Sequence, residues 1–395
     1  MDSLNSFFVR RACRLVLLVA ALALPPTAGI GEGASPSGEE RATEARKDAR
    51  LVLALERLVR TPGGPPGVIV VIRRGNERTV YRAGFAELET DRQPRASDHM
   101  RIASLAKAFS GATALALVTE GALSLNDTIG KLLPDLPREW HRVTLRQLLD
   151  PTSGLPDFGK SKAFAERVNA QPTNPPPPRK LLEYVADRPL EFPPGSDYRY
   201  SNSDNVAVGL MVEAVTEKRY VEVLRDEVLE PLKLGGTSLS RKVDLPVPYI
   251  HGYEANSDGG FTDVSEVIAF GGYAWASGGI VSTPNDLSRF VRAYVGGELF
   301  GTGPRAEQFR FIDGAKSSPP GPGRNAAGLA LFRYRTRCGT VYGHTGSILG
   351  YTQFIAASRN GNRALAFSVN AQLGEDIVPQ LRRVQELAVC VALGQ

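Results

Sequence analysis

The sequence predicts an α+β protein in which one antiparallel sheet, built from both chain ends, is flanked by helices and carries an inserted, mainly helical lobe. Two observations support this fold class. Strand patterns occur at 67–84 and again at 340–369, near the two ends of the 395-residue chain. Between them, residues 122–270 are rich in helical patterns interrupted by prolines. We therefore expect a sheet lobe from 46–105 and 270–395, and a mainly helical lobe from 106–269.

The first residues have the pattern of an export signal. Arg10, Arg11 and Arg14 precede an apolar run at 15–24, which two prolines and several small residues follow. The run is too short to cross a bilayer as a helix, which needs about 20 residues. We expect 1–34 to be a signal peptide and leader, a mature chain without an integral membrane span, and a periplasmic or extracellular location. The alternative is a buried N-terminal helix.

The secondary structure expected at the two ends follows from the alternation of apolar and polar residues and from residues that favour turns. After a helix at about 46–60, strands at 67–73 and 78–84 flank a turn at Asn76, which predicts a hairpin. Near the C-terminus, a strand at 340–344 precedes a second hairpin, 351–357 and 364–369, around the turn 359–362. A helix at about 375–391 ends the chain. The proline-rich segment 171–178 predicts an extended surface loop.

Composition and cysteine content exclude several classes of function. The net charge is only +5, and no block of basic residues suggests nucleic-acid binding. The four histidines form no cluster with zinc-like spacing, so we expect no metal and no cofactor. Export would leave Cys338 and Cys390 as a pair, which predicts a disulfide between the last sheet region and the C-terminal helix. Two free buried thiols are the alternative.

The expected helix at 102–119 contains one charged side chain, Lys107, among apolar and small residues. Such a helix should be buried, and burial lowers the pKa of lysine, so Lys107 could act as a neutral base. Ser104 lies one turn earlier on the same face. The pair therefore offers a hydroxyl nucleophile beside a proton acceptor. The alternative is that Ser104 only caps the helix and that Lys107 extends to solvent, because Ser-x-x-Lys alone is a weak pattern.

Two later motifs strengthen the catalytic interpretation. Tyr200-Ser-Asn202 follows a Pro-Pro-Gly turn and precedes a helical run, and His344-Thr345-Gly346-Ser347 lies in an expected strand. The order Ser-x-x-Lys, Tyr-x-Asn, His-Thr-Gly resembles the penicillin-recognising serine hydrolases, the family of class C β-lactamases and D-alanyl-D-alanine carboxypeptidases. The resemblance covers about 60–392. It implies a β-lactamase/transpeptidase-like fold.

The resemblance also implies a role for each motif residue. Ser104 would attack a carbonyl carbon while Lys107, with Tyr200, takes its proton. Tyr200 would then protonate the leaving amine, which requires a phenol whose pKa neighbouring cations lower. Asn202, His344, Thr345, Gly346 and Ser347 would bind the substrate: Asn202 its amide, Thr345 its carboxylate, and the strand from His344 to Gly346 its extended backbone. The backbone N–H groups of Ser104 and Ser347 would form the oxyanion hole.

Several other residues bear on this resemblance. Ser203-Asp204-Asn205 matches the second motif of class A β-lactamases, but the flanking residues favour Tyr200-Ser-Asn202, so we interpret Ser203 and Asp204 as ordinary residues at a helix start. His344 stands where β-lactamases usually have lysine, which favours a carboxypeptidase. Pro151 replaces a histidine common in relatives and affects only the local loop. His99, His141 and His251 receive no role.

The leading functional prediction is a D-alanyl-D-alanine carboxypeptidase-like peptidase that acts on cell-wall peptides. A β-lactamase or a carboxylesterase would use the same centre. A non-enzymatic penicillin-binding or sensor protein is the alternative from another class. The expected partner is a small-molecule or peptide substrate, such as a peptidoglycan stem peptide or a β-lactam, and not a nucleic acid.

Overall fold

The computed structural model describes residues 38–395, so the expected signal peptide and leader lie outside the described residues. Residues 42–395 form one compact unit. The division into lobes at 106 and 269 stays a prediction. Among the described helices, none combines the length and apolar character needed to cross a membrane.

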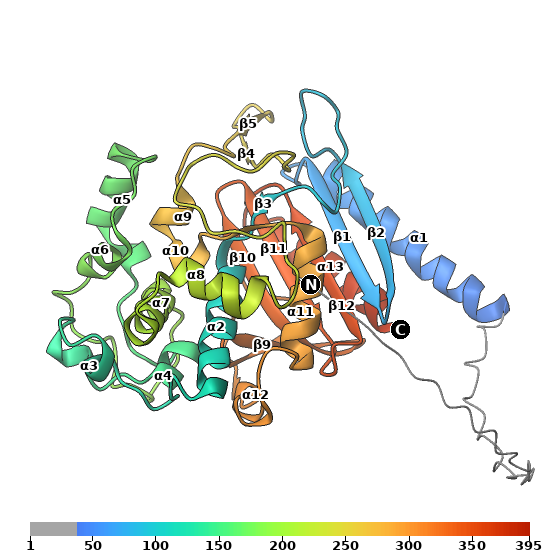
Figure 1. The fold of residues 1–395 in the computed structure, drawn as a ribbon. Coiled ribbons are helices and arrows are strands. Elements are labelled where there is room, and N and C mark those ends of the chain that lie inside the picture. Colours follow the sequence, from blue (N-terminus) through green and yellow to red (C-terminus); the bar gives the residue numbers. More distant parts are fainter. Residues whose placement is uncertain (1–37) are drawn as a thin grey trace, which may run out of the picture. The chain divides into compact units, whose positions relative to one another are not determined.

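An eight-stranded antiparallel sheet organises this unit, in the order β2-β1-β12-β11-β10-β9-β8-β7 (Figure 1). Its N-terminal strands β1 and β2 therefore join the C-terminal strands through β12, as expected for a sheet built from both ends. The strands are β1 (Gly67–Arg74), β2 (Glu77–Gly84), β7 (Ile312–Asp313), β8 (Arg324–Gly328), β9 (Leu331–Thr336), β10 (Gly339–Ile348), β11 (Tyr351–Ala357) and β12 (Arg363–Val369). Two small ladders pair β3 (Met100–Arg101) with β6 (Val281–Ser282), and β4 (Tyr253–Ala255) with β5 (Phe261–Asp263).

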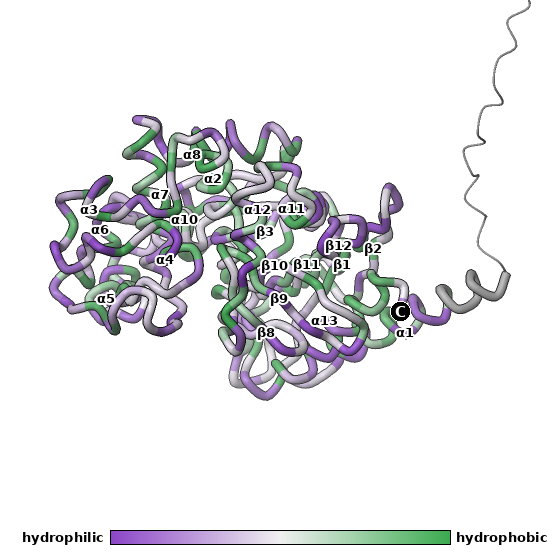
Figure 2. Tube along the Cα trace, turned by 90° about the horizontal axis from the view of Figure 1, so that it is seen from below, coloured by the Kyte–Doolittle hydropathy of each residue, from purple (hydrophilic) through white to green (hydrophobic). Residues whose placement is uncertain are grey.

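The alternation of side chains along the central strands creates two separate cores, because successive residues of a strand point to opposite faces. Phe354 and Phe367 pack with leucines of α1 (Gly38–Arg60) and with α13 (Val378–Leu393). Ile355 and Ala366 face the other core, which α11 (Pro284–Gly296) and the buried helix α2 (Ala106–Glu120) share. Apolar residues predominate along α2, as Figure 2 shows.

The remaining helices lie mostly in the segment expected to be helical. They are α3 (Ile129–Leu132), α4 (Leu145–Leu149), α5 (Lys162–Ala170), α6 (Pro178–Glu183), α7 (Asn202–Thr216), α8 (Tyr220–Leu224), α9 (Phe270–Tyr273), α10 (Trp275–Gly278), α12 (Thr302–Gln308), the 3-10 turns η1 (Ala103–Leu105), η2 (Arg138–Trp140) and η3 (Phe158–Lys160), and the π-helical turn η4 (Arg225–Leu229).

Several local predictions are confirmed, and one is corrected. Both hairpins form with their turns at 75–76 and 358–362. Cys338, in the β9–β10 turn, is bonded to Cys390 of α13, which settles the choice between a disulfide and free thiols. The proline segment is irregular, except that Pro178 is the first residue of α6, where its missing N–H costs nothing. The single helix expected from Ile102 is instead two elements, η1 and α2.

Candidate active site

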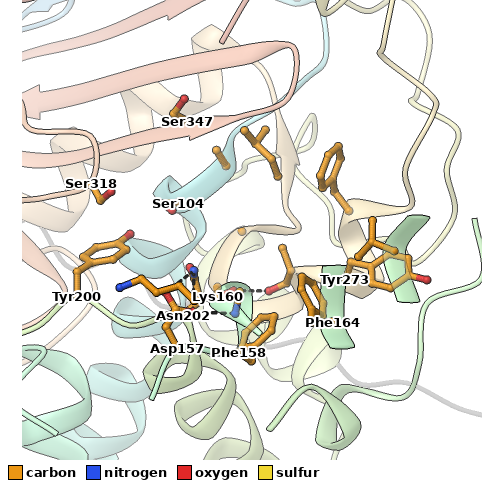
Figure 3. Close-up of a pocket in the computed structure, with 18 of the residues that line it drawn as sticks. Ser104, Asp157, Phe158, Lys160, Phe164, Tyr200, Asn202, Tyr273, Ser318 and Ser347 are labelled. Atoms are coloured by element: carbon orange, nitrogen blue, oxygen red, sulfur yellow. Dashed lines mark hydrogen bonds between the residues drawn. The ribbon is translucent and has the colours of Figure 1, made fainter. Parts of the chain in front are cut away.

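A cavity of about 490 Å³ opens where η1, η3, the N-terminus of α7, the α9–α10 segment and the end of β10 meet. Its lining includes four of the predicted site residues, Ser104, Tyr200, Asn202 and Ser347. Figure 3 shows Ser104 and Tyr200 on one side of the cavity and Phe158, Phe164 and Tyr273 on the other. The fold thus brings together residues from distant parts of the chain.

Ser104 lies in η1, one turn before Lys107, and the Lys107 Nζ is 3.1 Å from the Ser104 Oγ. The preceding residue, Ala103, has a φ of +51°, in the left-handed region that a side chain with a Cβ rarely adopts. Strain of this kind is typical of functional sites, where the surrounding structure fixes an unfavourable backbone. Here it lies at the start of η1, directly before Ser104, which lines the cavity.

Lys107 is buried, with only 3% of its surface exposed, and its pKa is lowered from 10.5 to about 7 mainly by burial. Its Nζ lies 2.7 Å from the Asn202 Oδ1 and 2.7 Å from the Ser277 carbonyl oxygen. A neutral amine has two N–H groups and one lone pair. Because these two acceptors take both N–H groups, the lone pair is directed toward the Ser104 hydroxyl. The geometry therefore suits proton transfer from Ser104 to Lys107.

Tyr200 corrects one expectation, since its pKa is raised well above 10 and not lowered. The main cause is burial, which disfavours the phenolate. The Lys107 Nζ lies 5.0 Å from the centroid of the Tyr200 ring, but it does not offset the effect of burial on the Tyr200 pKa. The nearby Ser104 side chain acts in the opposite direction and lowers the pKa of Tyr200. The buried Tyr200 hydroxyl nevertheless has no partner with hydrogen-bond geometry among the described residues. Tyr200 is therefore a neutral phenol with a proton to donate.

Asn202 is held at both ends of its amide, which the sequence did not suggest. Its Oδ1 accepts from Lys107, and its Nδ2 lies 3.2 Å from each carboxylate oxygen of Asp157. Asp157 also accepts from the backbone N–H of Gly159, so η3 is fixed to the same group. Asn202 thus orients Lys107, and its expected bond to a substrate amide stays a prediction. No role for Asp157 had been predicted from the sequence.

Ser203 and Asp204 lie in the first turn of α7, as the sequence interpretation had it, and both side chains also bond to a neighbouring loop. The Ser203 Oγ donates to the Pro156 carbonyl at 2.6 Å and accepts from the Phe158 N–H. Asp204 is fully buried and bonded to the Ser153 hydroxyl at 2.5 Å, and burial raises its pKa well above the ordinary range. These bonds fasten α7 to the loop that carries Asp157.

The strand β10 contributes unequally to the cavity. Gly346 allows a close approach to η1, because a Cβ there would come within 2.8 Å of the Ile102 carbonyl oxygen and 3.0 Å of the Ser104 nitrogen. The side chains of His344 and Thr345 are absent from the described lining of the cavity. His344 is buried, which lowers its pKa to about 3, and the Thr345 Oγ1 donates to the Pro319 carbonyl at 2.5 Å. Neither offers the charge or free donor expected for a carboxylate.

The far wall of the cavity is aromatic. Phe164 of α5 meets Phe158 and Tyr273 edge to face, with ring centroids 5.0 Å and 6.0 Å away. Edge-to-face packing of this kind fixes the rings before any ligand binds. Beside this wall, Asp157 supplies the single carboxylate of the described lining, and Lys160 lies exposed. The cavity thus combines an apolar surface with a nucleophile and a negative charge.

Two solved structures share this fold over nearly their whole length. A D-stereospecific amidohydrolase from Streptomyces sp. is 27% identical, with a TM-score of 0.73 over 85% of this chain and 98% of that one. A D-amino acid amidase from Ochrobactrum anthropi SV3 is 25% identical, with a TM-score of 0.76 over 87% of this chain and 98% of that one. The β-lactamase/transpeptidase-like fold is therefore confirmed.

Two curated relatives match this chain over part of their length. Protein flp of Staphylococcus aureus (strain MW2) is 27% identical over 58% of this chain, which covers 45% of that protein. The D-alanyl-D-alanine-carboxypeptidase/endopeptidase AmpH of Escherichia coli (strain K12) is 25% identical over 63% of this chain and 62% of that protein. The chain thus spans about half the length of these relatives. The sequence model of the Beta-lactamase family matches residues 55–389, and the chain belongs to this family of serine hydrolases.

Proposed function

We propose that the chain is an exported hydrolase that cleaves amide bonds in small substrates through an acyl-enzyme on Ser104, and that the acyl part of the substrate is a D-amino acid with an apolar side chain. The observation that carries the proposal is the Ser104–Lys107 pair, 3.1 Å apart, with the pKa of Lys107 lowered to about 7. A base with a pKa near the working pH is the most effective proton acceptor.

The proposed reaction has two stages. The Ser104 Oγ gives its proton to Lys107 and forms a bond to the carbonyl carbon, and the negative charge on the carbonyl oxygen is stabilised by the backbone N–H groups of Ser104 and Ser347. The C–N bond breaks as a proton passes to the leaving nitrogen, from Lys107 through the neutral Tyr200 hydroxyl. Water then repeats the sequence, with Lys107 as base, and releases the acid and free Ser104.

The cavity lining supports the substrate class. The aromatic wall of Phe158, Phe164 and Tyr273 suits an apolar side chain. Asp157, which forms no ion pair among the described residues, suits the ammonium group of an amino acid amide. The preference for the D configuration is suggested by the names of the two structural relatives.

A D-alanyl-D-alanine carboxypeptidase acting on cell-wall peptides is the second candidate. Such a substrate carries a terminal carboxylate, and the exposed Lys160 at the cavity is a cation without an ion pair in the described chain. AmpH, whose name includes this activity, also supports it. Against it, His344 is neutral and the Thr345 hydroxyl is already bonded to Pro319.

Hydrolysis of D-phenylalanine amide, L-phenylalanine amide and D-alanyl-D-alanine by the purified chain tests both candidates. We expect turnover of the D-amide well above that of the L-amide, and its loss in Ser104→Ala but not in the exposed turn variant Ser257→Ala. Intact mass after mixing with a penicillin should show an adduct in wild type that is absent in Ser104→Ala. If Ser104→Ala hydrolyses all three substrates as fast as wild type, the proposal is wrong.

Lys160→Met separates the two candidates. Under the amidase proposal, this change leaves kcat/KM for the amide, which has no carboxylate, nearly unaltered. Under the carboxypeptidase candidate, D-alanyl-D-alanine is the faster substrate and Lys160→Met lowers its kcat/KM by about fivefold, since an exposed ion pair contributes on the order of 1 kcal/mol.

A further inference from the structure

A second cavity, of about 480 Å³, is lined by residues of β8, β9 and α13. These three elements are neighbours in Figure 2. We call this cavity the arginine pocket. It is lined by five cationic side chains and one acidic one: Lys316, Arg324, Arg333, Arg335, Arg382 and Asp313. None of these residues lines the catalytic cavity.

The strand register forces three of the arginines together. Arg324 of β8 is directly opposite Arg335 of β9, and Arg333 lies two residues before Arg335, on the same side of the strand. Like charges placed directly opposite in a sheet are destabilising. The neighbouring strand β7 pairs only with Ala326 and Ala327, so the Arg324 end of β8 stays open as an edge.

The charges of the pocket are only partly compensated. Asp313 forms an ion pair with Arg333, and the Arg333 Nε is buried without a hydrogen-bond partner in the described chain. Arg382 donates to the carbonyl oxygens of Gly321 and Gly323, at 3.0 Å and 3.1 Å, which fixes its guanidinium without neutralising it. The side chains of Lys316, Arg324 and Arg335 have no carboxylate partner among the described residues. Four positive charges therefore remain.

We propose that the arginine pocket binds an anion with at least two phosphate groups, held by Arg324, Arg335 and Arg382. Guanidinium groups match phosphate with paired hydrogen bonds, and several of them around one cavity suit a ligand with more than one charge. The volume lies within the range of small-ligand sites and exceeds that needed by a single phosphate. Such a ligand would also relieve the repulsion between Arg324 and Arg335.

The pocket is connected to the catalytic cavity through one loop, residues 314–323. Lys316 of this loop lines the arginine pocket, Ser318 lines the catalytic cavity, and the Lys316 carbonyl accepts from the Tyr198 hydroxyl at 2.7 Å. A ligand in the arginine pocket would therefore contact the same loop that lines the catalytic cavity, without touching Ser104.

Isothermal titration of the full chain with inorganic phosphate, inorganic pyrophosphate and a glycerol phosphate oligomer tests the proposal. We expect one pyrophosphate per chain, bound more tightly than phosphate, and an affinity that falls as ionic strength rises. The double variant Arg324→Gln/Arg335→Gln should raise the Kd for pyrophosphate by at least about tenfold, equivalent to 1.4 kcal/mol.

The matched control is Arg337→Gln, in the adjacent β9–β10 turn, whose side chain faces Glu386 and lies outside the pocket lining. It removes one guanidinium, as each half of the double variant does, and should leave the Kd nearly unchanged. The double variant should also melt at or above the wild-type temperature and keep Ser104-dependent hydrolysis, so lost binding would not reflect misfolding. Absence of binding to every probe, or an equal loss in Arg337→Gln, would overturn the proposal.

The two phosphate sources give different results. Tight binding of pyrophosphate alone points to a free small anion. Binding of the glycerol phosphate oligomer at least as tightly as pyrophosphate points to phosphate groups carried by a polymer.

Discussion

Replacement of Lys107 by methionine tests the central electrostatic claim of the active site. Methionine keeps most of the apolar stem of lysine and removes the amine. In the folded chain the pKa of Lys107 is about 7, whereas the unfolded chain has the ordinary value of 10.5. Between these two pH values the unfolded state binds more protons than the folded state. The free energy of unfolding therefore rises with pH in this window.

The size of the effect follows from the two pKa values. At pH 7, the shift lowers the free energy of unfolding by roughly 4 kcal/mol relative to an unshifted lysine. At pH 9, the same calculation gives roughly 2 kcal/mol. Wild type should therefore gain about 2 kcal/mol more than Lys107→Met between pH 7 and pH 9. Bonds lost to Asn202 and Ser277 affect the variant equally at both pH values and cancel from this difference.

Urea unfolding at pH 7, 8 and 9, followed by the fluorescence of the buried Trp140 and Trp275, measures this difference. Lys162→Met, at a side chain 91% exposed, is the matched control and should run parallel to wild type. The same deprotonation should appear in catalysis, as a rise of kcat/KM through pH 7. If wild type and Lys107→Met show equal slopes of stability against pH, the pKa of Lys107 is not lowered and the reasoning fails.

Three further predictions concern the support of the site. Gly346→Ala should lower kcat/KM by at least tenfold, because the added Cβ would displace the η1 backbone. The control Gly303→Ala, whose Cβ would meet no atom within 4 Å, should keep wild-type activity. Equal activity of the two variants would contradict the proposed close contact. Replacing Cys338 and Cys390 by serine should lower the free energy of unfolding by about 4 kcal/mol, because the unfolded chain is no longer closed into a loop with a sequence separation of 52. Urea unfolding measures this change, and an unchanged midpoint and slope would refute it. Asp157→Asn should lower kcat by roughly 10- to 100-fold with an unchanged circular dichroism spectrum, since Asn202 would lose its hydrogen bonds to the carboxylate. An unaltered kcat would show that Asn202 does not need these bonds.

Local sequence patterns were sufficient to predict the hairpins and the Ser104–Lys107 pair. Alternation and turn residues determine the β11–β12 hairpin, because both strands and the turn lie within 19 residues. The spacing of Ser104 and Lys107 places them one turn apart on any helical backbone, so their contact required no tertiary information. The left-handed backbone of Ala103 at the start of η1 was not predictable, because the surrounding structure and not a local pattern stabilises it.

The support of the site depends on contacts between distant residues, and there sequence reasoning was incomplete. Asp157 meets Asn202 across 45 residues, and nothing in its own segment indicates an anchoring role. The pKa of Tyr200 follows from the amount of surrounding protein, which no local pattern contains. The Thr345 hydroxyl donates to a carbonyl oxygen 26 residues earlier in the chain. The His344-Thr-Gly motif alone could not show that this hydroxyl already has a partner.

The pairing of β1 with β12 has a consequence for how the protein is made. Val68 of β1 is opposite Val369 of β12. During synthesis, β1 therefore has no partner on this side until β12, one of the last segments, has been made. Until then β1 has an open edge toward the missing strand, and Gly346 is not yet present to pack against η1. Completion of the sheet therefore requires closure of a loop of about 300 residues, a slow step typical of high contact order. Chains that end before residue 363 lack β12 and should accumulate as inactive fragments, susceptible to proteases and to edge-to-edge association.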